Sequence, residues 1–203
     1  MSYLFRHLDV VARLSGEHVR LVGVSLTIAL AIAVPVAVAI TRRPWLARPV
    51  FGVFSLVYTI PSLALFALLI PVFGLGFWTA VAGLAAYAQM VLVRNTVAAL
   101  RGIEPAVLEA AHGMGMSDRQ IFWRVQRPLA MPVFIAGVRV ATVSLIGIAA
   151  IAAWINAGGL GTLVLDGIEH DYPQKALAGA LAAVLLAVVA DQGLRMLERR
   201  LAR

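Results

Sequence analysis

The chain has 203 residues, of which 62% are hydrophobic and 13% charged, so it carries far more apolar sequence than the single core of a soluble domain can use. It contains no cysteine, which excludes disulfides, Cys-ligated metal sites and cysteine nucleophiles. The net charge of +7 comes from short arginine clusters between apolar runs, which favours a membrane topology signal over a nucleic-acid surface. We therefore predict an all-α, polytopic membrane protein that faces lipid and binds no nucleic acid.

Five apolar runs are long enough to cross a bilayer as helices. The first, 21–40, holds twenty residues without a charge, about 30 Å of helix, which matches the hydrocarbon thickness. Residues 1–20 have mixed charge and are predicted to form an N-terminal extracytoplasmic amphipathic arm rather than a cleaved signal peptide. Pro61 could split the second run into two shorter helices, and 151–165 could enter the membrane without crossing it. The four later runs are 50–73, 76–93, 129–153 and 176–190.

The positions of the cations predict the orientation of these spans. Twelve cations lie in the 42–48 connection, in the 94–128 loop and after the last span, and with five spans these three segments share one side. Four cations lie on the other side, where five acidic residues offset them. Because cytoplasmic segments carry the excess of Lys and Arg, we expect the N-terminus outside and the C-terminus inside. The transmembrane domain then covers 21–193, and 194–203 form a basic cytoplasmic tail.

The loop 94–128 between the third and fourth spans is the most structured polar stretch of the chain. Glu104 followed by Pro105 is typical of a helix start, because proline at the first helical position loses no hydrogen bond. The helix is expected to reach Met114 and to end at Gly115, which can adopt the left-handed conformation of a helix C-cap. Its small and apolar residues recur at three- and four-residue spacing and give it one apolar face.

A second short helix is expected after Ser117. Ser117 with Gln120 three residues later has the pattern of a capping box, and this helix would run to about residue 126 before Pro128 opens the fourth span. Two short amphipathic helices joined at a glycine form a compact knob with an apolar face. Such a knob either lies on the membrane surface or docks against a partner protein, and the periodicity alone favours neither.

The residues of this knob resemble the EAA signature of the permease subunits of ABC importers. Its spacing is matched by Glu109-Ala110-Ala111, Gly115, Val125 and Pro128. Val125 and Arg127 stand where isoleucine and leucine are usual. The resemblance extends over about residues 20–195 and is closest to permeases of the osmoprotectant group. It is carried by Thr59–Leu65, Pro71, Gly74–Gly76, Arg94–Thr96, Gly113–Met116 and Ala157–Gly161.

The resemblance implies a type I importer permease of about five transmembrane helices with a two-helix cytoplasmic coupling loop, in a prokaryotic cytoplasmic membrane. It implies a second permease, the same or a related chain, two cytoplasmic ATPase subunits and an extracytoplasmic substrate-binding protein. ATP and Mg would be bound by the ATPase partners, with no cofactor on this chain. The implied cargo is a quaternary ammonium osmoprotectant such as glycine betaine, choline or carnitine. The contact with the ATPase is implied for Glu109, Ala110, Ala111, Met114, Gly115 and Met116.

Two other functions remain open at this point. Because the loop signature is shared broadly, the chain could be an ABC permease for methionine or another amino acid. An intramembrane enzyme such as a rhomboid-like protease needs a Ser nucleophile and a His base at membrane depth, and His7, His18, His112 and His170 all fall outside the predicted spans. These histidines lack metal-ligand spacing and are predicted to be solvated surface residues, so no metal site is expected. We predict a transport subunit rather than an enzyme.

Two irregular, polar segments are candidates for the translocation pathway, because such backbone is tolerated in a span only around a protein-lined or watery cavity. For the segment 58–62 the alternative is a plain proline kink with hydroxyls bonded to backbone carbonyls. For 156–161 the alternative is a helix-packing motif or a turn. In the family's pattern, glycine is common at Asn156, and an apolar residue with a proline at Gln89-Met90. The candidates are Tyr58, Thr59, Pro61, Ser62, Gln89, Asn156, Gly158 and Gly159.

Arg139 is a charge inside the fourth span, roughly 10–16 Å from its cytoplasmic start. A charge at this depth is costly and is expected to face protein or a water-filled cavity. A fixed cation on the pathway would repel a quaternary ammonium cargo. We therefore predict a structural pairing of Arg139 with a carboxylate or with helix-end carbonyls, and Asp191 is the candidate partner.

Overall fold

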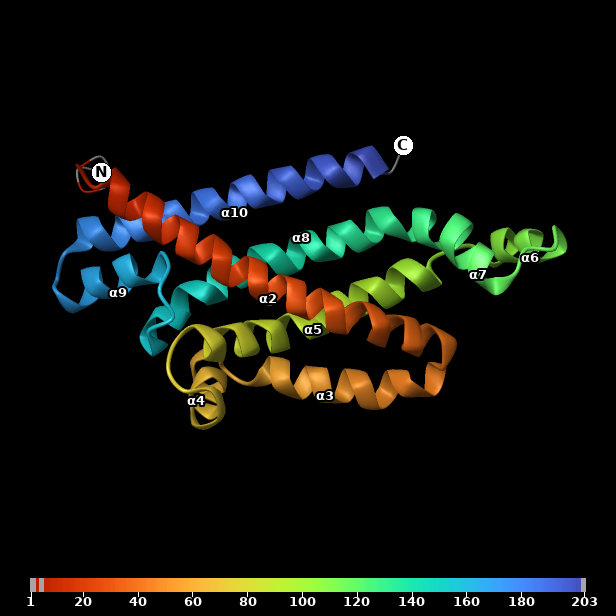
Figure 1. Cartoon of the computed structure of the whole chain (residues 1–203), viewed down its shortest axis with the longest axis horizontal. Coiled ribbons are helices and arrows are strands. Elements are labelled where there is room, and N and C mark those ends of the chain that lie inside the picture. Colours follow the sequence, from red (N-terminus) through yellow and green to blue (C-terminus); the bar gives the residue numbers. More distant parts are fainter. Residues whose placement is uncertain (1–2, 4–5, 202–203) are drawn as a thin grey trace.

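The computed structural model describes residue 3 and residues 6–201, and its long helices run along one axis of the molecule (Figure 1). In that part of the chain the regular structure is helical, which confirms the all-α prediction. The long helices are α2 (Leu8–Arg42), α5 (Phe77–Arg101), α8 (Arg127–Ile151) and α10 (Pro173–Leu201). The shorter elements are η1 (Pro44–Leu46), α3 (Ala47–Thr59), α4 (Ser62–Phe73), α6 (Pro105–Gly113), α7 (Asp118–Ile121), η2 (Phe122–Gln126), η3 (Ala152–Ile155) and α9 (Gly161–Glu169).

Among the described residues, four helices are long and apolar enough to cross a membrane: α2, α5, the helix that runs on from Asp118 to Ile155, and α10. Helices α3 and α4 meet at 102° and make a fifth crossing if the bent pair is counted as one span. The break follows from the sequence, because the residue before a proline is disfavoured in the α conformation. Ile60 accordingly has φ −70° and ψ 128° and ends α3 ahead of Pro61.

The helices extend beyond the predicted spans, and three predicted boundaries are not breaks in the structure. Residues 8–20 of the predicted arm belong to α2, and the predicted tail continues α10 as far as Leu201. Residues 1–2, 4–5 and 202–203 of these two segments lie outside the described residues. Pro128 does not open a new helix, because α7, η2 and α8 follow one another without interruption. Apolar composition indicates which part of a helix meets lipid. It does not indicate where the helix ends, because Arg and Glu are also good helix formers and continue the same helix beyond the lipid.

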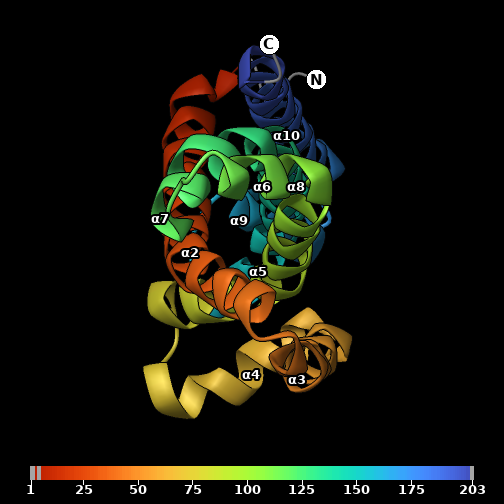
Figure 2. The same ribbon diagram turned by 90° about the vertical axis from the view of Figure 1, so that its right-hand side faces the viewer.

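Small residues build the core in which α5 lies. Ala29, Ala33 and Ala37 form a buried stripe at four-residue spacing on α2, and α5 packs along it. Small side chains let helix backbones approach closely, which stabilises packing between helices in a membrane. Helix α5 also packs against α3, α4 and α8, whereas α10 packs mainly against α8 and α9. The end view shows α3 and α4 on one side of the α2 and α5 helices and α10 on the other (Figure 2).

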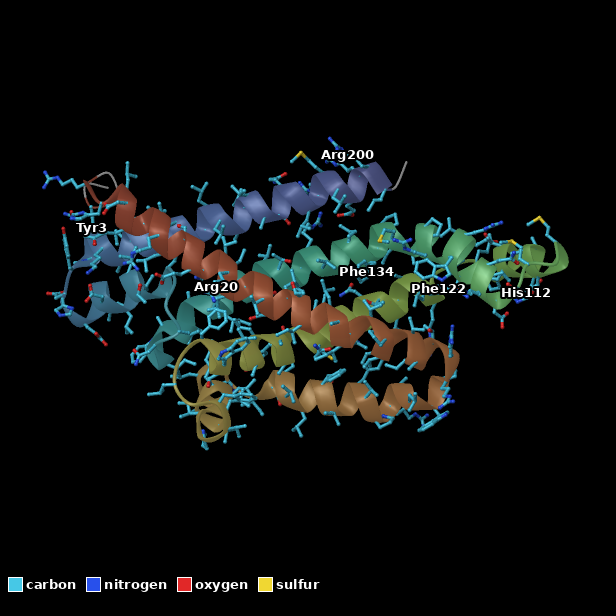
Figure 3. The ribbon with its side chains drawn as sticks, viewed as in Figure 1. Tyr3, Arg20, His112, Phe122, Phe134 and Arg200 are labelled. Carbon is cyan, nitrogen blue, oxygen red and sulfur yellow. The ribbon has the colours of Figure 1, made fainter. Side chains whose placement is uncertain are left out.

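The three arginine-rich segments gather at one end of the molecule. The η1 connection, α6 with α7, and the C-terminal end of α10 lie toward the right of Figure 1, and the start of α2, α4 and α9 lie toward the left. Among the labelled side chains, His112 and Phe122 lie at the right end with Arg200 toward it, and Tyr3 lies at the left end (Figure 3). The clustering that the charge pattern predicts is therefore present in the fold.

Candidate functional site

The first helix of the 94–128 loop forms and ends as its sequence predicts. Glu104 is the N-cap of α6 in an extended conformation, and Pro105 occupies the first turn. Gly115 has φ +76°, and its amide donates to the carbonyl of His112 at 2.9 Å. The next amide, of Met116, donates to the carbonyl of Ala111 at 3.2 Å, which completes a Schellman cap. The loop therefore turns sharply at Gly115.

The second helix starts at the predicted capping box. The Ser117 hydroxyl accepts a hydrogen bond from the backbone N–H of Gln120 at 3.4 Å, and the backbone N–H of Ser117 donates to Gln120 Oε1 at 2.8 Å. These two bonds satisfy backbone donors that a helix start leaves free. The helix then continues through η2 into α8. The guanidinium of Arg127 lies 5.1 Å from the ring centroid of Trp123, which accommodates a charge where the family pattern is apolar.

The loop presents one part of the α6 surface to solvent and buries another. Met114 is 74% exposed, and Glu109 and Ala110 are also exposed. Ala111 is 2% exposed and Met116 is half-buried, so Ala111 faces the chain itself rather than a partner. Leu108 anchors α6 to a small apolar cluster at the ends of α5 and α8. The exposed set Glu109, Ala110 and Met114 is therefore the part of the predicted contact that a partner can reach.

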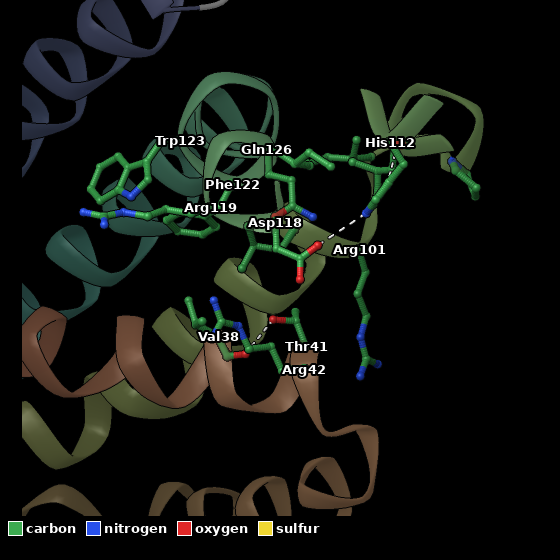
Figure 4. Close-up of a pocket in the computed structure, with 15 residues that line it drawn as sticks. Val38, Thr41, Arg42, Arg101, His112, Asp118, Arg119, Phe122, Trp123 and Gln126 are labelled. Atoms are coloured by element: carbon green, nitrogen blue, oxygen red, sulfur yellow. Dashed lines mark hydrogen bonds and ion pairs between the residues drawn. The ribbon is translucent and has the colours of Figure 1, made fainter. Parts of the chain in front are cut away.

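A cavity of about 940 Å³ separates this loop from the ends of α2 and α5 (Figure 4). Arg42 and Arg101 line it from these two helices, and Arg119 lines it from α7. His112 Nε2 lies 3.4 Å from Asp118 Oδ1 and joins α6 to α7 across its rim. The cavity therefore lies between α6 and the ends of α2 and α5, and three arginines from α2, α5 and α7 line it.

At the break between α3 and α4, the first candidate pathway segment satisfies much of its own hydrogen bonding. The Thr59 hydroxyl donates to the carbonyl of Leu56 at 2.7 Å, as the proline-kink alternative requires. The Tyr87 hydroxyl donates to the carbonyl of Ile60, and the Tyr58 and Tyr87 rings meet edge to face at 5.9 Å. Tyr58, Thr59 and Pro61 are exposed and Ser62 is half-buried. Hydrogen bonds from Thr59 and Tyr87 thus stabilise the kink, while part of the segment stays exposed.

Gln89 lies inside the chain and away from that surface. It is 5% exposed, and its amide nitrogen donates to the carbonyls of Ala29 at 3.2 Å and Ala85 at 3.1 Å. Among the described residues, nothing donates to its buried Oε1. Gln89 therefore links α5 to α2, and the structure does not bring it together with the other pathway candidates.

The second candidate segment, 156–161, is a turn built on left-handed residues. Asn156 has φ +60°, which explains why glycine is common there and why asparagine is accepted. Gly158 and Gly159 have φ near +80°. The amide of Gly159 donates to Glu17 Oε2 at 3.2 Å, and the amide of Leu160 donates to His18 Nδ1 at 3.3 Å. The segment is therefore fastened to α2, and it lies at the end of the molecule opposite α6.

His18 corrects the prediction that the histidines are solvated surface residues. It is 0% exposed and hydrogen bonds to the turn 156–161 and to the carbonyl of Ile146 at 3.1 Å. The prediction failed because the first span was begun at Leu21. The buried face of α2 continues upstream through His18 to Leu14 at three- and four-residue spacing, and that spacing is the signal that could have identified it.

Arg139 makes the predicted ion pair and a second one. Its Nε lies 3.2 Å from Asp191 Oδ1, which confirms the predicted partner, and its Nη1 lies 2.9 Å from Glu198 Oε2. Glu198 was missed because the fifth span was ended at Ala190. It follows Asp191 by seven residues, or two helical turns, and so lies on the same face of α10. Within the described part of the chain, no three His, Asp or Glu side chains gather where they could hold a metal ion.

The bundle of long apolar helices, with a capped loop projecting beyond it, is the architecture of a membrane-spanning protein. The chain belongs to the family described as binding-protein-dependent transport system inner membrane component, which matches residues 27–203. The osmoprotectant import permease protein OsmW of Salmonella typhimurium is 42% identical over 203 residues, covering 98% of this chain and 94% of the relative. The glycine betaine/carnitine/choline transport system permease protein OpuCB of Bacillus subtilis is 35% identical over 186 residues, covering 92% and 86%.

Among solved structures, the inward-facing MetNI methionine ABC transporter matches with a TM-score of 0.85 and 24% identity. The match covers 97% of this chain and 98% of the MetNI chain. At this identity the likeness establishes a shared fold and carries no information on the cargo. It confirms the type I importer permease architecture that the loop signature implies.

Proposed function

We propose that this chain is the permease subunit of an ATP-driven importer of quaternary ammonium osmoprotectants such as glycine betaine, choline and carnitine. The observation that carries the proposal is the 42% identity, over almost the whole of both chains, to a permease named for osmoprotectant import. The amino-acid alternative has weaker support, because OsmW and OpuCB, at 42% and 35% identity, are named for osmoprotectant and glycine betaine/carnitine/choline transport, whereas the methionine transporter is similar in fold alone. The cargo is selected mainly by a separate extracytoplasmic binding protein.

In this proposal α6 couples the permease to an ATPase subunit, which binds ATP and Mg. The exposed side chains of Glu109, Ala110 and Met114 form the contact, and Gly115 permits the sharp turn behind it. The 940 Å³ cavity beneath the loop lets α6 move relative to α2 and α5 when the ATPase pair closes. The working complex contains a second permease and two ATPase subunits.

The proposed orientation places the α6 end in the cytoplasm and the start of α2 outside. The gathering of the arginine-rich segments at the α6 end supports it, since the inner side of a membrane protein carries the excess of cations. The binding protein then docks at the opposite end, where α4, α9 and the turn 156–161 lie.

Proteoliposomes that contain the permease, its ATPase and the binding protein test the cargo directly. We expect ATP-dependent uptake of labelled glycine betaine or choline, with no competition from a hundredfold excess of methionine. Uptake of methionine in place of the ammonium compounds would contradict the proposal and support the amino-acid alternative.

The absence of cysteine from the chain makes the coupling contact testable by cross-linking. Met114→Cys is expected to cross-link to an ATPase subunit that carries a single cysteine in its docking groove. Trp78→Cys is the matched control, because Trp78 is also well exposed but lies at the start of α5, away from α6. Equal cross-linking of the two variants, or none from Met114→Cys, would show that α6 is not the docking element.

A further inference from the structure

The turn 157–161 is held against α2 by two consecutive side chains of that helix. Glu17 Oε2 accepts from the Gly159 amide at 3.2 Å, and His18 Nδ1 accepts from the Leu160 amide at 3.3 Å. Two successive backbone amides of the turn thus meet two successive acceptors. Thr162 closes the turn from its other side, since its hydroxyl donates to the carbonyl of Gly159 at 2.8 Å.

The hydrogen bonds of His18 define its protonation state. Because Nδ1 accepts from an amide, it carries no proton, and because Nε2 faces the carbonyl of Ile146 at 3.1 Å, it carries one and donates it. His18 is therefore the neutral Nε2–H tautomer. A second proton on Nδ1 would point at the Leu160 N–H and replace a hydrogen bond by a contact between two donors.

The glycines make this close approach possible. A Cβ on Gly159 would lie 2.9 Å from His18 Nδ1, and a Cβ on Gly158 would lie 2.9 Å from Glu17 Oε2. Both residues also have positive φ, a region that side chains rarely adopt. At Gly159 a Cβ would also lie 3.3 Å from the His18 Cα, so a side chain there would push the turn away from α2, whereas at Gly158 it would displace the flexible Glu17 carboxylate.

The fastened turn borders open space. A cavity of about 450 Å³ lies beside it and is lined by Glu17, Arg20, Phe77, Trp78 and Ala157. The guanidinium of Arg20 lies 5.1 Å from the Phe77 ring centroid, and Arg13 Nη1 pairs with Glu17 Oε1 at 2.7 Å. Arg13, Glu17 and Arg20 are the charged groups of α2 within five residues of His18, while α8 contributes the carbonyl of Ile146 and the turn contributes the amide of Leu160. A displaced turn therefore has room to move into.

We propose that Glu17 and His18 are positioning residues for transport, which form a latch that holds the turn 157–161 against α2 and closes the pathway at this end. Neutral His18 keeps the latch closed, and its protonation releases the turn. The consequence for uptake rests on the proposed function, whereas the latch itself is a property of this chain. Histidine is the side chain whose charge changes most readily near neutral pH, so acidification is the perturbation to which this latch can respond.

Amide hydrogen exchange of the complex in nanodiscs tests the latch without reference to cargo. After correction for the intrinsic pH dependence of exchange, we expect the protection of the Gly159 and Leu160 amides to fall about three- to tenfold between pH 8 and pH 5, as the loss of one hydrogen bond predicts. Amides in the middle of α5 serve as the internal reference. Unchanged protection at pH 5 would overturn the proposal.

Two isosteric variants separate the two bonds of His18. His18→Asn places an acceptor near the Nδ1 position, so Leu160 should stay protected at both pH values. His18→Gln places a donor near the Nε2 position and leaves Leu160 without its acceptor, so protection should be low at both. His170→Asn is the matched control, because that histidine is exposed, caps the end of α9 and bonds to Asp166 of that helix. If His18→Asn loses protection on acidification as the wild type does, His18 is not the sensor.

Uptake of labelled glycine betaine then tests the positioning role. The wild type and His170→Asn should lose coupling of uptake to ATP hydrolysis on acidification, and His18→Asn should keep it. If the exchange result holds but His18→Asn shows the wild-type pH profile of uptake, the latch does not control transport. If the wild type transports no ammonium cargo at any pH, the proposed function fails, and the exchange data still decide whether the latch exists.

If His18 variants fail to assemble, Glu17→Ala provides a second test at a half-buried position. It removes the acceptor of the Gly159 amide and should lower the protection of that amide about three- to tenfold at every pH. The Leu160 amide should retain its dependence on pH. If both amides of Glu17→Ala stay as protected as in the wild type, the proposal is overturned.

Discussion

Removal of the positive charge of Arg139 should loosen α10 from α8, because it leaves both Asp191 and Glu198 without their counter-charge. Arg139 reaches these carboxylates at 3.2 and 2.9 Å. The three side chains are 23%, 32% and 26% exposed, so water screens the network in part. Breaking a fully buried pair costs about 3–5 kcal/mol and breaking an exposed pair about 0–1 kcal/mol. We therefore expect Arg139→Met to cost about 1–3 kcal/mol.

Thermal unfolding of the purified permease in detergent measures this effect. For a chain of this length, 1 kcal/mol corresponds to about 2–4 °C in Tm. Combining Arg139→Met with Asp191→Asn and Glu198→Gln should recover most of the loss, because no charge is then left unpaired. Arg200→Met is the control, because Arg200 is an exposed arginine of α10, the helix that carries Asp191 and Glu198. A wild-type Tm for Arg139→Met, or no recovery in the triple variant, would refute the reasoning.

Three further substitutions test the local geometry. Gly115→Ala places a side chain at φ +76° and should cost about 1–2 kcal/mol in the loop and lower uptake per ATP hydrolysed. Full coupling in this variant would contradict the proposed role of the turn behind α6. Ser117→Ala removes the cap and should cost about 1 kcal/mol, measured as faster amide exchange over 118–121, with wild-type exchange as the contrary result. The Cβ of Gly161→Ala would overlap the carbonyl of Ala150, so this variant should reduce the yield of assembled permease. Gly193→Ala is the control, because Gly193 has open space around it and its yield should not change. Equal yields would show that the close approach of Gly161 to Ala150 is not required.

Much of the fold could be predicted because local chemistry determines it. The caps at Glu104, Gly115 and Ser117 depend on residues within one turn of each other, so the sequence pattern alone located them. The break at Pro61 is equally local, because proline restricts the residue before it. The length of each run without charged residues predicts the part of each helix that crosses the membrane. These features needed no knowledge of which helices meet.

The features that sequence reasoning missed depend on contacts between distant segments. The spacing of the apolar residues around His18 indicates its burial, but its partner Leu160 lies 142 residues downstream and the local sequence does not identify it. Glu198 lies in the predicted basic cytoplasmic tail, because composition marks the edge of the lipid and not the end of a helix. Ala111 belongs to the family signature yet faces inward, since the signature does not distinguish a residue that docks a partner from one that packs the loop.

The central claim is that the chain couples an ATPase to the import of an ammonium cargo, and the rate of ATP hydrolysis in nanodiscs tests it most directly. The complex of permease and ATPase should hydrolyse ATP several times faster with a binding protein loaded with glycine betaine or choline than with the empty protein. Glu109→Lys, a change on the exposed face of α6, should abolish that stimulation without preventing insertion of the permease. A rate that is indifferent to the loaded binding protein, or full stimulation in Glu109→Lys, would contradict the account.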